Sequence, residues 1–216
     1  MITFENKYEE TELNEFKSLG AGGQVIVIKS ASQYAGPSGM SLKIEIDIAE
    51  GDFKGMYQEK YDKDDRPEKK WNNNATKYVS LKPENERFVF ALITALERSN
   101  PGVKFTSNVN GTDVFDESKI VGKLCGGEFG LKEYRNSEQE LRTVAEFQNF
   151  RDKNKVKDIK MPSVKVINGM NSAGYDTYDY VDYEEYMNKP KQNSIDSNFG
   201  DLVNEATIDL DDADLD

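Results

Sequence analysis

Residues 40–48, MSLKIEIDI, decide the fold class of this chain. Leu42, Ile44, Ile46 and Ile48 alternate with polar or charged residues, the pattern of an antiparallel strand with one buried face. The β-branched run at 25–28, VIVI, precedes it across a Gly- and Pro-containing turn at 35–39. The two runs predict a β-hairpin at the start of a mainly β domain.

The remaining patterned segments predict the rest of that domain. We expect a turn at 51–55, a third strand at 56–61, a polar loop at 62–77, a helix at about 84–98, and a fourth and a fifth strand at 120–125 and 141–150. A linker begins near residue 161, and one more short strand at 164–167 would lie in it. Three strands, a helix and two strands is the order of the OB-fold, a five-stranded Greek-key barrel with a helix between strands 3 and 4. Another small β-barrel or a β-sandwich remains the alternative.

The net charge of −12 is distributed unevenly along the chain. Residues 171–216 hold 13 Asp/Glu against 2 Lys, and residues 1–16 hold 5 Glu against 1 Lys. The segment between them has a net charge of +3 and is therefore mildly basic. These differences predict three parts: an N-terminal extension at 1–19, an OB-fold nucleic-acid-binding domain at 20–168, and a disordered acidic tail at 169–216.

Composition argues against several classes of function. The chain has no histidine and a single cysteine, Cys125, so histidine-based catalysis, zinc fingers and an internal disulfide are not expected. No carboxylates group as a two-metal site would need, and we expect neither a bound metal, nor a cofactor, nor enzymatic activity. The sequence also suggests no signal peptide and no membrane-spanning run, which predicts a cytoplasmic protein without a membrane partner.

Two segments carry a family resemblance. They are VIKSASQYAGPSGMSLKIEIDIAEGDFKGMYQEKY and ESKIVGKLCGGEFGLKEY, and their motifs are Glu50-Gly51, Phe53-Lys54-Gly55 and Val121-Gly122-Lys123. Over roughly residues 20–155 the chain resembles single-stranded DNA-binding proteins encoded by phages of Gram-positive bacteria. The resemblance implies an OB-fold, a role in phage DNA replication or recombination, and a location in the host cell cytoplasm.

Single-strand binders stack bases on aromatic rings and follow phosphates with Lys and Arg. The candidates on the expected third strand and the loop after it are Lys54, Tyr57, Lys60, Tyr61, Lys63, Arg66, Lys69, Lys70 and Trp71. Those in and beside the expected fourth and fifth strands are Lys132, Tyr134, Arg135, Arg142, Phe150, Arg151 and Lys153.

The competing interpretation of the aromatic candidates is that they fill the core. It applies to Tyr57, Tyr61 and Phe150. On an expected strand, only the odd or even position of a residue decides whether its side chain faces the core or the surface. Trp71 lies in a polar stretch beside lysines and is the stronger candidate for contact with DNA. Glu45 and Asp47 argue against a uniformly basic groove.

The acidic end resembles the partner-recruiting tails of bacterial and phage single-strand-binding proteins. Its candidate partner-binding residues are Asp209, Leu210, Asp211, Asp212, Asp214, Leu215 and Asp216. The Pro-Phe ending of the bacterial proteins is missing, and a tail that only increases solubility is the alternative.

The sequence therefore predicts a sequence-nonspecific single-stranded DNA-binding protein whose tail recruits replication or recombination proteins. An OB-like adaptor that binds protein partners is the first alternative, and a metal-dependent nuclease ranks last. The oligomeric state is left open, a homo-oligomer included.

Overall fold

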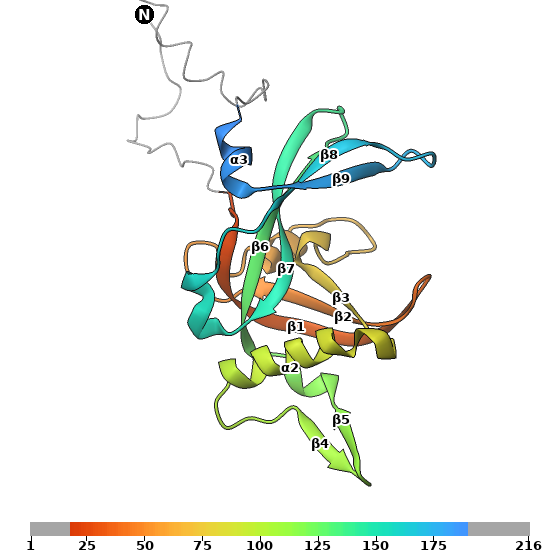
Figure 1. Ribbon diagram of the computed structural model, residues 1–216, viewed down its shortest axis with the longest axis vertical. Coiled ribbons are helices and arrows are strands. Elements are labelled where there is room, and N and C mark those ends of the chain that lie inside the picture. Colours follow the sequence, from red (N-terminus) through yellow and green to blue (C-terminus); the bar gives the residue numbers. More distant parts are fainter. Residues whose placement is uncertain (1–17, 190–216) are drawn as a thin grey trace, which may run out of the picture.

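The computed structural model describes residues 18–189, which form a mainly β structure (Figure 1). Its strands are β1 (Gly22–Gly36), β2 (Gly39–Ile48), β3 (Thr76–Ser80), β4 (Thr106–Val109), β5 (Thr112–Phe115), β6 (Leu124–Arg135), β7 (Leu141–Arg151), β8 (Val164–Met170) and β9 (Asp176–Val181). Its α-helices are α1 (Met56–Asp62), α2 (Glu86–Ser99) and α3 (Tyr183–Asn188). Short 3₁₀ turns are η1 (Asn73–Ala75), η2 (Pro83–Asn85), η3 (Glu117–Ile120) and η4 (Lys153–Asp158).

Seven strands form one mixed sheet in the order β3-β2-β1-β6-β8-β9, with β7 paired to β6. The long strand β6 is the junction, because residues 124–129 pair with β1 and Lys132 pairs in parallel with Lys165 of β8. β4 and β5 form a separate hairpin that projects from the body beyond α2 (Figure 1). Within residues 18–189 no hydrogen-bonded register joins β3 to β7, so the sheet is not closed.

The core lies under the β1–β2 hairpin, as the alternation predicts. Ile46 and Ile48 of β2 are buried, and so are Ile28 and Ile26, their register partners on β1. α2 packs its apolar stripe, which includes Leu92 and Leu96, against β3, β6 and β7. The predicted hairpin, the helix and the strands near 141–150 and 164–167 are confirmed within a few residues.

The predicted third strand at 56–61 is wrong, because these residues form α1. Gly55, with φ 76°, takes a left-handed conformation that suits glycine and ends the preceding turn. The buried carboxylate of Asp47 then accepts hydrogen bonds from the backbone N–H groups of Tyr57 and Gln58. The Asp47 side chain on β2 thus accepts hydrogen bonds from N–H groups in the first turn of α1, which have no partner within the helix. The third strand is β3, within and just after the stretch predicted to be a loop.

The predicted fourth strand at 120–125 is displaced. Ile120 ends η3, and β6 starts at Leu124 and continues to Arg135 through Gly126, Gly127 and Gly130. These glycines are not in turns. A Cβ on Gly126 would lie 2.8 Å from the backbone oxygens of both Arg151 and Asp152, so glycine permits a close approach between β6 and the end of β7.

The predicted boundary at 168/169 falls inside β8, and the segment after it is ordered up to the last described residue. β9 pairs with β8, and α3 begins at Asp182, whose carboxylate accepts hydrogen bonds from the N–H groups of Glu184 and Glu185. Backbone pairing and this cap stabilise a segment whose acidic composition predicts disorder. Residues 190–216 and 1–17, including most of the predicted tail and extension, lie outside the described residues.

Candidate nucleic-acid interface

A groove of about 480 Å³ lies on the outer face of β1, β2 and β3, opposite the buried isoleucines. Its lining residues are Lys29, Ser30, Lys43, Glu45, Gln58, Tyr61, Lys69, Lys70, Trp71, Asn73, Thr76 and Tyr78. The register explains the floor, because Glu45 lies between Ser30 on β1 and Thr76 on β3. Partners in adjacent strands point to the same face, so these three side chains meet.

One wall of the groove is aromatic. The Trp71 indole N–H donates to the carbonyl oxygen of Ile46 at 3.1 Å, which fixes the ring against β2. Tyr61, from α1, lies with its ring centroid 5.5 Å from that of Trp71. Lys69 places its Nζ 5.7 Å from the centre of the Tyr61 ring, within cation–π range. The wall therefore combines two aromatic rings with a cation.

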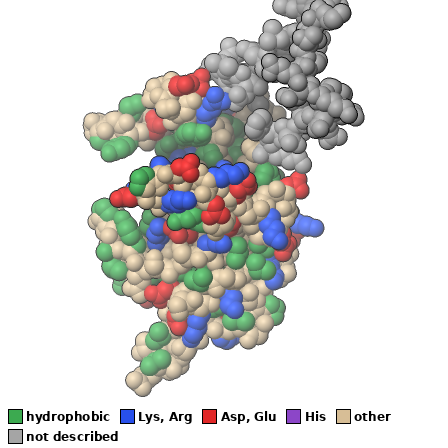
Figure 2. All heavy atoms as spheres, turned by 180° about the vertical axis from the view of Figure 1, so that it is seen from behind, with side chains coloured by type: hydrophobic (Ala, Val, Ile, Leu, Met, Phe, Trp, Pro, Cys, Tyr) green, Lys and Arg blue, Asp and Glu red, His purple; other side chains and the backbone are tan. Residues whose placement is uncertain are grey.

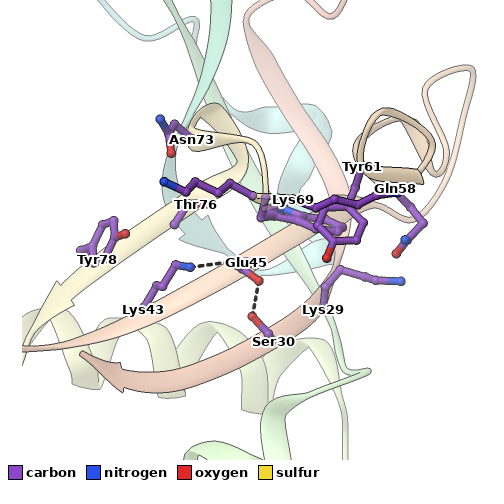
Figure 3. Close-up of a pocket in the computed structure, with 12 residues that line it drawn as sticks. Lys29, Ser30, Lys43, Glu45, Gln58, Tyr61, Lys69, Asn73, Thr76 and Tyr78 are labelled. Carbon is purple, nitrogen blue, oxygen red and sulfur yellow. Dashed lines mark hydrogen bonds and ion pairs between the residues drawn. The ribbon is translucent and has the colours of Figure 1, made fainter. Parts of the chain in front are cut away.

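The other side of the groove carries Tyr78 of β3 (Figure 3). Its side chain is 49% exposed, and its ring lies 5.3 Å from that of Tyr34, which is 44% exposed. Sequence reasoning missed this pair because it expected no strand at 76–80, and so placed nothing beside Tyr34 across the sheet. The alternation of 76–80, TKYVS, was the available signal, since it puts Tyr78 on the same face as Thr76.

The floor holds a hydrogen-bonded charge network (Figure 3). Glu45 accepts from the Ser30 hydroxyl at 2.6 Å and from Lys43 Nζ at 2.5 Å. The hydrogen bond to Glu45 raises the pKa of Lys43, so this lysine stays charged at neutral pH. Counting all lining residues, the groove has four lysines and one glutamate.

Of the sequence candidates, the groove brings together Tyr61, Lys69, Lys70 and Trp71. Tyr57 does not line it, because its ring is 3% exposed, and burial raises the pKa of its hydroxyl. Phe150 also packs against the core, edge-on to Phe147. Tyr57 and Phe150 therefore pack in or against the core. Tyr61 and Trp71 line the groove, and Trp71 is partly buried and also packs against the core.

The other candidates on α1 and its flanks are exposed cations near the groove. Lys54 and Lys60 are exposed, with Lys60 Nζ over the Tyr57 ring. Lys63 pairs with Glu59 on the same helix, and Arg66 pairs with Asp64. The Arg66 hydrogen bond lowers the pKa of Asp64 to about 2.

The candidates on β6, β7 and η4 do not line the groove, and the three arginines among them form ion pairs within the protein. Arg135 contacts Asp176, Arg142 contacts Glu140, and Arg151 forms an ion pair with Glu128. Lys153 donates its backbone N–H to Ser99 Oγ, and Tyr134 is 39% exposed on β6. These side chains form no common site with the groove.

A second aromatic and basic face lies on the β6–β8–β9 part of the sheet. Register places Lys132, Lys165 and Tyr180 in one row, and Lys132 Nζ lies 5.3 Å from the centre of the Tyr178 ring. Tyr180 is 68% exposed. Glu146 contacts both lysines and neutralises part of their charge. Sequence reasoning missed Tyr178 and Tyr180 because it assigned them to the tail.

Lys and Arg side chains alternate with acidic ones over the face seen in Figure 2, between the protruding β8–β9 and β4–β5 hairpins. On this face, therefore, the positive charges do not form a broad basic surface. The tail candidates from Asp209 to Asp216 lie outside the described residues.

Other chemical sites are not evident in residues 18–189. In this range no three His, Cys, Asp or Glu side chains are grouped to hold a metal ion. Cys125 is buried, and burial raises the pKa of its thiol to about 12, so it is not a reactive nucleophile. The described helices include none that is long and apolar enough to cross a membrane.

The chain was also compared with known proteins. It matches no protein-family model and no curated protein.

Proposed function

We propose that the protein binds single-stranded DNA without marked sequence specificity, and that the groove on β1–β2–β3 is the binding site. The observation that carries the proposal is the combination of Tyr61, Trp71 and Tyr78 with Lys29, Lys43, Lys69 and Lys70 in one groove. In single-strand binders, aromatic rings stack on bases and lysines contact phosphates. The single carboxylate in the groove leaves a local excess of positive charge.

The fold proposed for this function is an OB-type barrel. β1, β2, β3, β6 and β7 would be its five strands, with α2 between the third and the fourth. The strand order β3-β2-β1-β6-β7 agrees with this assignment, and η1, just before β3, packs against β7 where a barrel would close. β8, β9 and α3 would then be an addition to the barrel.

The resemblance to phage single-strand-binding proteins supports a role in DNA replication or recombination in the host cytoplasm. Under this proposal the acidic residues 209–216 recruit replication or recombination proteins. The same charge would compete with DNA for the lysines of the groove, since both interactions are electrostatic.

Fluorescence anisotropy with a labelled single-stranded oligonucleotide tests the proposal. We expect saturable binding that weakens with salt, and weaker binding by the variant Lys69→Ala/Lys70→Ala. For single strands, each lost phosphate contact should lower the salt slope by about 0.7. The control variant Lys104→Ala/Lys119→Ala removes two lysines that pair with Glu97 and Asp116 outside the groove, and should bind like the wild type.

A chain ending after Lys189 tests the tail. It should bind DNA more tightly than the full chain because the acidic competitor is gone. The deletion belongs after residue 189, since truncation after Gly169 would remove β9 and α3. Absence of DNA binding by both chains would refute the proposal.

An adaptor that binds protein is the second candidate. It is favoured by the exposed aromatic rings of α2, where Phe88 is 49% and Phe90 59% exposed. An adaptor predicts no oligonucleotide binding with or without residues 190–216.

A further inference from the structure

Glu45 is the one acidic residue in a groove with four lysines, and a carboxylate does not bind phosphate. It lies at the centre of the floor, between β1 and β3, and its side chain is 16% exposed. Glu45 lines the groove, so part of its side chain faces the ligand side. A phosphate placed there would meet a like charge.

The carboxylate retains hydrogen-bonding capacity. It has two oxygens with about four lone-pair positions, and the structure fills one on each oxygen: Lys43 on Oε1 and Ser30 on Oε2. An ionised carboxylate only accepts. Whatever binds above Glu45 is therefore favoured if it brings an N–H donor.

The aromatic side chains determine which part of a nucleotide reaches Glu45. Tyr61 stands on one side of the floor and Tyr78 on the other (Figure 3), and the Trp71 ring lies 5.5 Å from the Tyr61 ring. A base that stacks its flat face on one of these rings can turn its edge toward the floor. The lysines around the rim, such as Lys29 and Lys69, remain for the phosphates.

We propose that Glu45 contacts the hydrogen-bonding edge of one base and favours bases with an exocyclic amino group, so that cytosine is preferred to thymine or uracil. The inference rests on the proposed binding of single-stranded DNA in this groove. The N4 amino group of cytosine donates to a carboxylate. Uracil and thymine have a carbonyl oxygen at that position, which forms no hydrogen bond with the carboxylate, so these bases reach Glu45 only if they shift to present N3–H instead.

The experiment compares oligodeoxycytidine with oligodeoxyuridine, each of about 12 nucleotides, within the range of OB-fold site sizes. The uracil oligomer also lacks the thymine methyl group, so the two differ only in the base edge. Anisotropy is measured with the full chain near pH 8, where cytosine is unprotonated. The wild type should prefer the cytosine oligomer by about tenfold, or about 1.4 kcal/mol.

The variant Glu45→Gln isolates the cause. Its amide has the size of the carboxylate but both donates and accepts, so either base edge finds a partner. We expect the ratio to fall to about one, mainly because the uracil oligomer binds more tightly. The matched control Glu59→Gln removes the same charge from the exposed face of α1, where Glu59 pairs with Lys63, and should keep the tenfold ratio.

Equal binding of both oligomers by the wild type would overturn the role of Glu45 while leaving the proposed function intact. A preference that survives in a folded Glu45→Gln variant would do the same. Binding of neither oligomer would refute the proposed function itself. The wild-type ratio decides the first point even if the variant does not fold.

Discussion

Tyr78 offers a direct test of base stacking, because it lies on the surface of β3 and its removal should affect binding more than folding. The ring is 49% exposed and contacts Tyr34 at 5.3 Å. Losing such an aromatic pair costs about 1 kcal/mol of folding free energy. For a chain of this size that lowers Tm by about 2–4 °C, so Tyr78→Ala should remain folded.

The expected effect on binding is larger. Replacing a base-stacking ring with alanine costs about 1–3 kcal/mol, which corresponds to roughly 5- to 150-fold weaker binding. Tyr78→Phe retains the ring and should bind nearly as the wild type does. Anisotropy titrations with a pyrimidine oligonucleotide, together with circular dichroism melts, measure both quantities.

The matched control is Phe90→Ala on α2, a ring of comparable exposure, 59%, outside the groove. It should leave affinity unchanged. The reasoning is refuted if folded Tyr78→Ala binds as tightly as the wild type, or if Phe90→Ala weakens binding as much.

Three further predictions concern stability. Asp47→Asn should lower the free energy of unfolding by about 1–3 kcal/mol in urea titrations, since the carboxylate accepts three backbone N–H bonds and an amide can accept at only one atom; an unchanged midpoint would contradict this anchoring of α1. Gly23→Ala should cost about 1–3 kcal/mol by the same measurement, because its Cβ would lie 2.0 Å from the Val156 carbonyl oxygen, whereas alanine at Gly20 has open space. Glu146 is partly buried, which acts to raise its pKa, but hydrogen bonds and charges of Lys165 and Lys132 lower it overall. The wild type should therefore have a higher free energy of unfolding than Glu146→Gln. This difference should be complete above the ordinary pKa of 4.5 and be lost as pH falls through the lower folded-state pKa. A difference in the free energy of unfolding that grows on acidification would contradict the assignment.

The parts of the fold that sequence predicts are those whose local pattern agrees with the final packing. The alternation at 40–48 predicts β2 because one face of that strand is buried along most of its length. The helical spacing of Leu92 and Leu96 predicts α2 for the same reason. Periodicity succeeds where burial is regular.

The parts that sequence misses depend on distant contacts. Tyr57 and Tyr61 are four residues apart, a spacing that fits one face of a strand as well as one face of a helix. Asp47, ten residues before Tyr57, decides for the helix by accepting its N–H bonds. β9 is stabilised by backbone pairing with β8, which acidic composition does not indicate.

The sequence predicts some of the residues that line the groove and misses others. Trp71, Lys69 and Lys70 were identified from an aromatic residue beside lysines in a polar stretch, and they line the groove. Lys29, Lys43 and Tyr78 were not, because their meeting depends on the register of three strands and on the bulge at Lys29. Sequence names candidate residues, and strand register decides which ones share a face.

The central claim is tested most directly by the fluorescence of Trp71, the single tryptophan of the chain, during titration with a single-stranded oligonucleotide. Its indole lines the groove and lies 5.5 Å from the Tyr61 ring, so a base entering the site changes its surroundings. The account predicts saturable quenching at about 50 mM salt, with an affinity that falls steeply toward about 200 mM. Unchanged fluorescence at low salt, with no binding by anisotropy at the same concentrations, would contradict it.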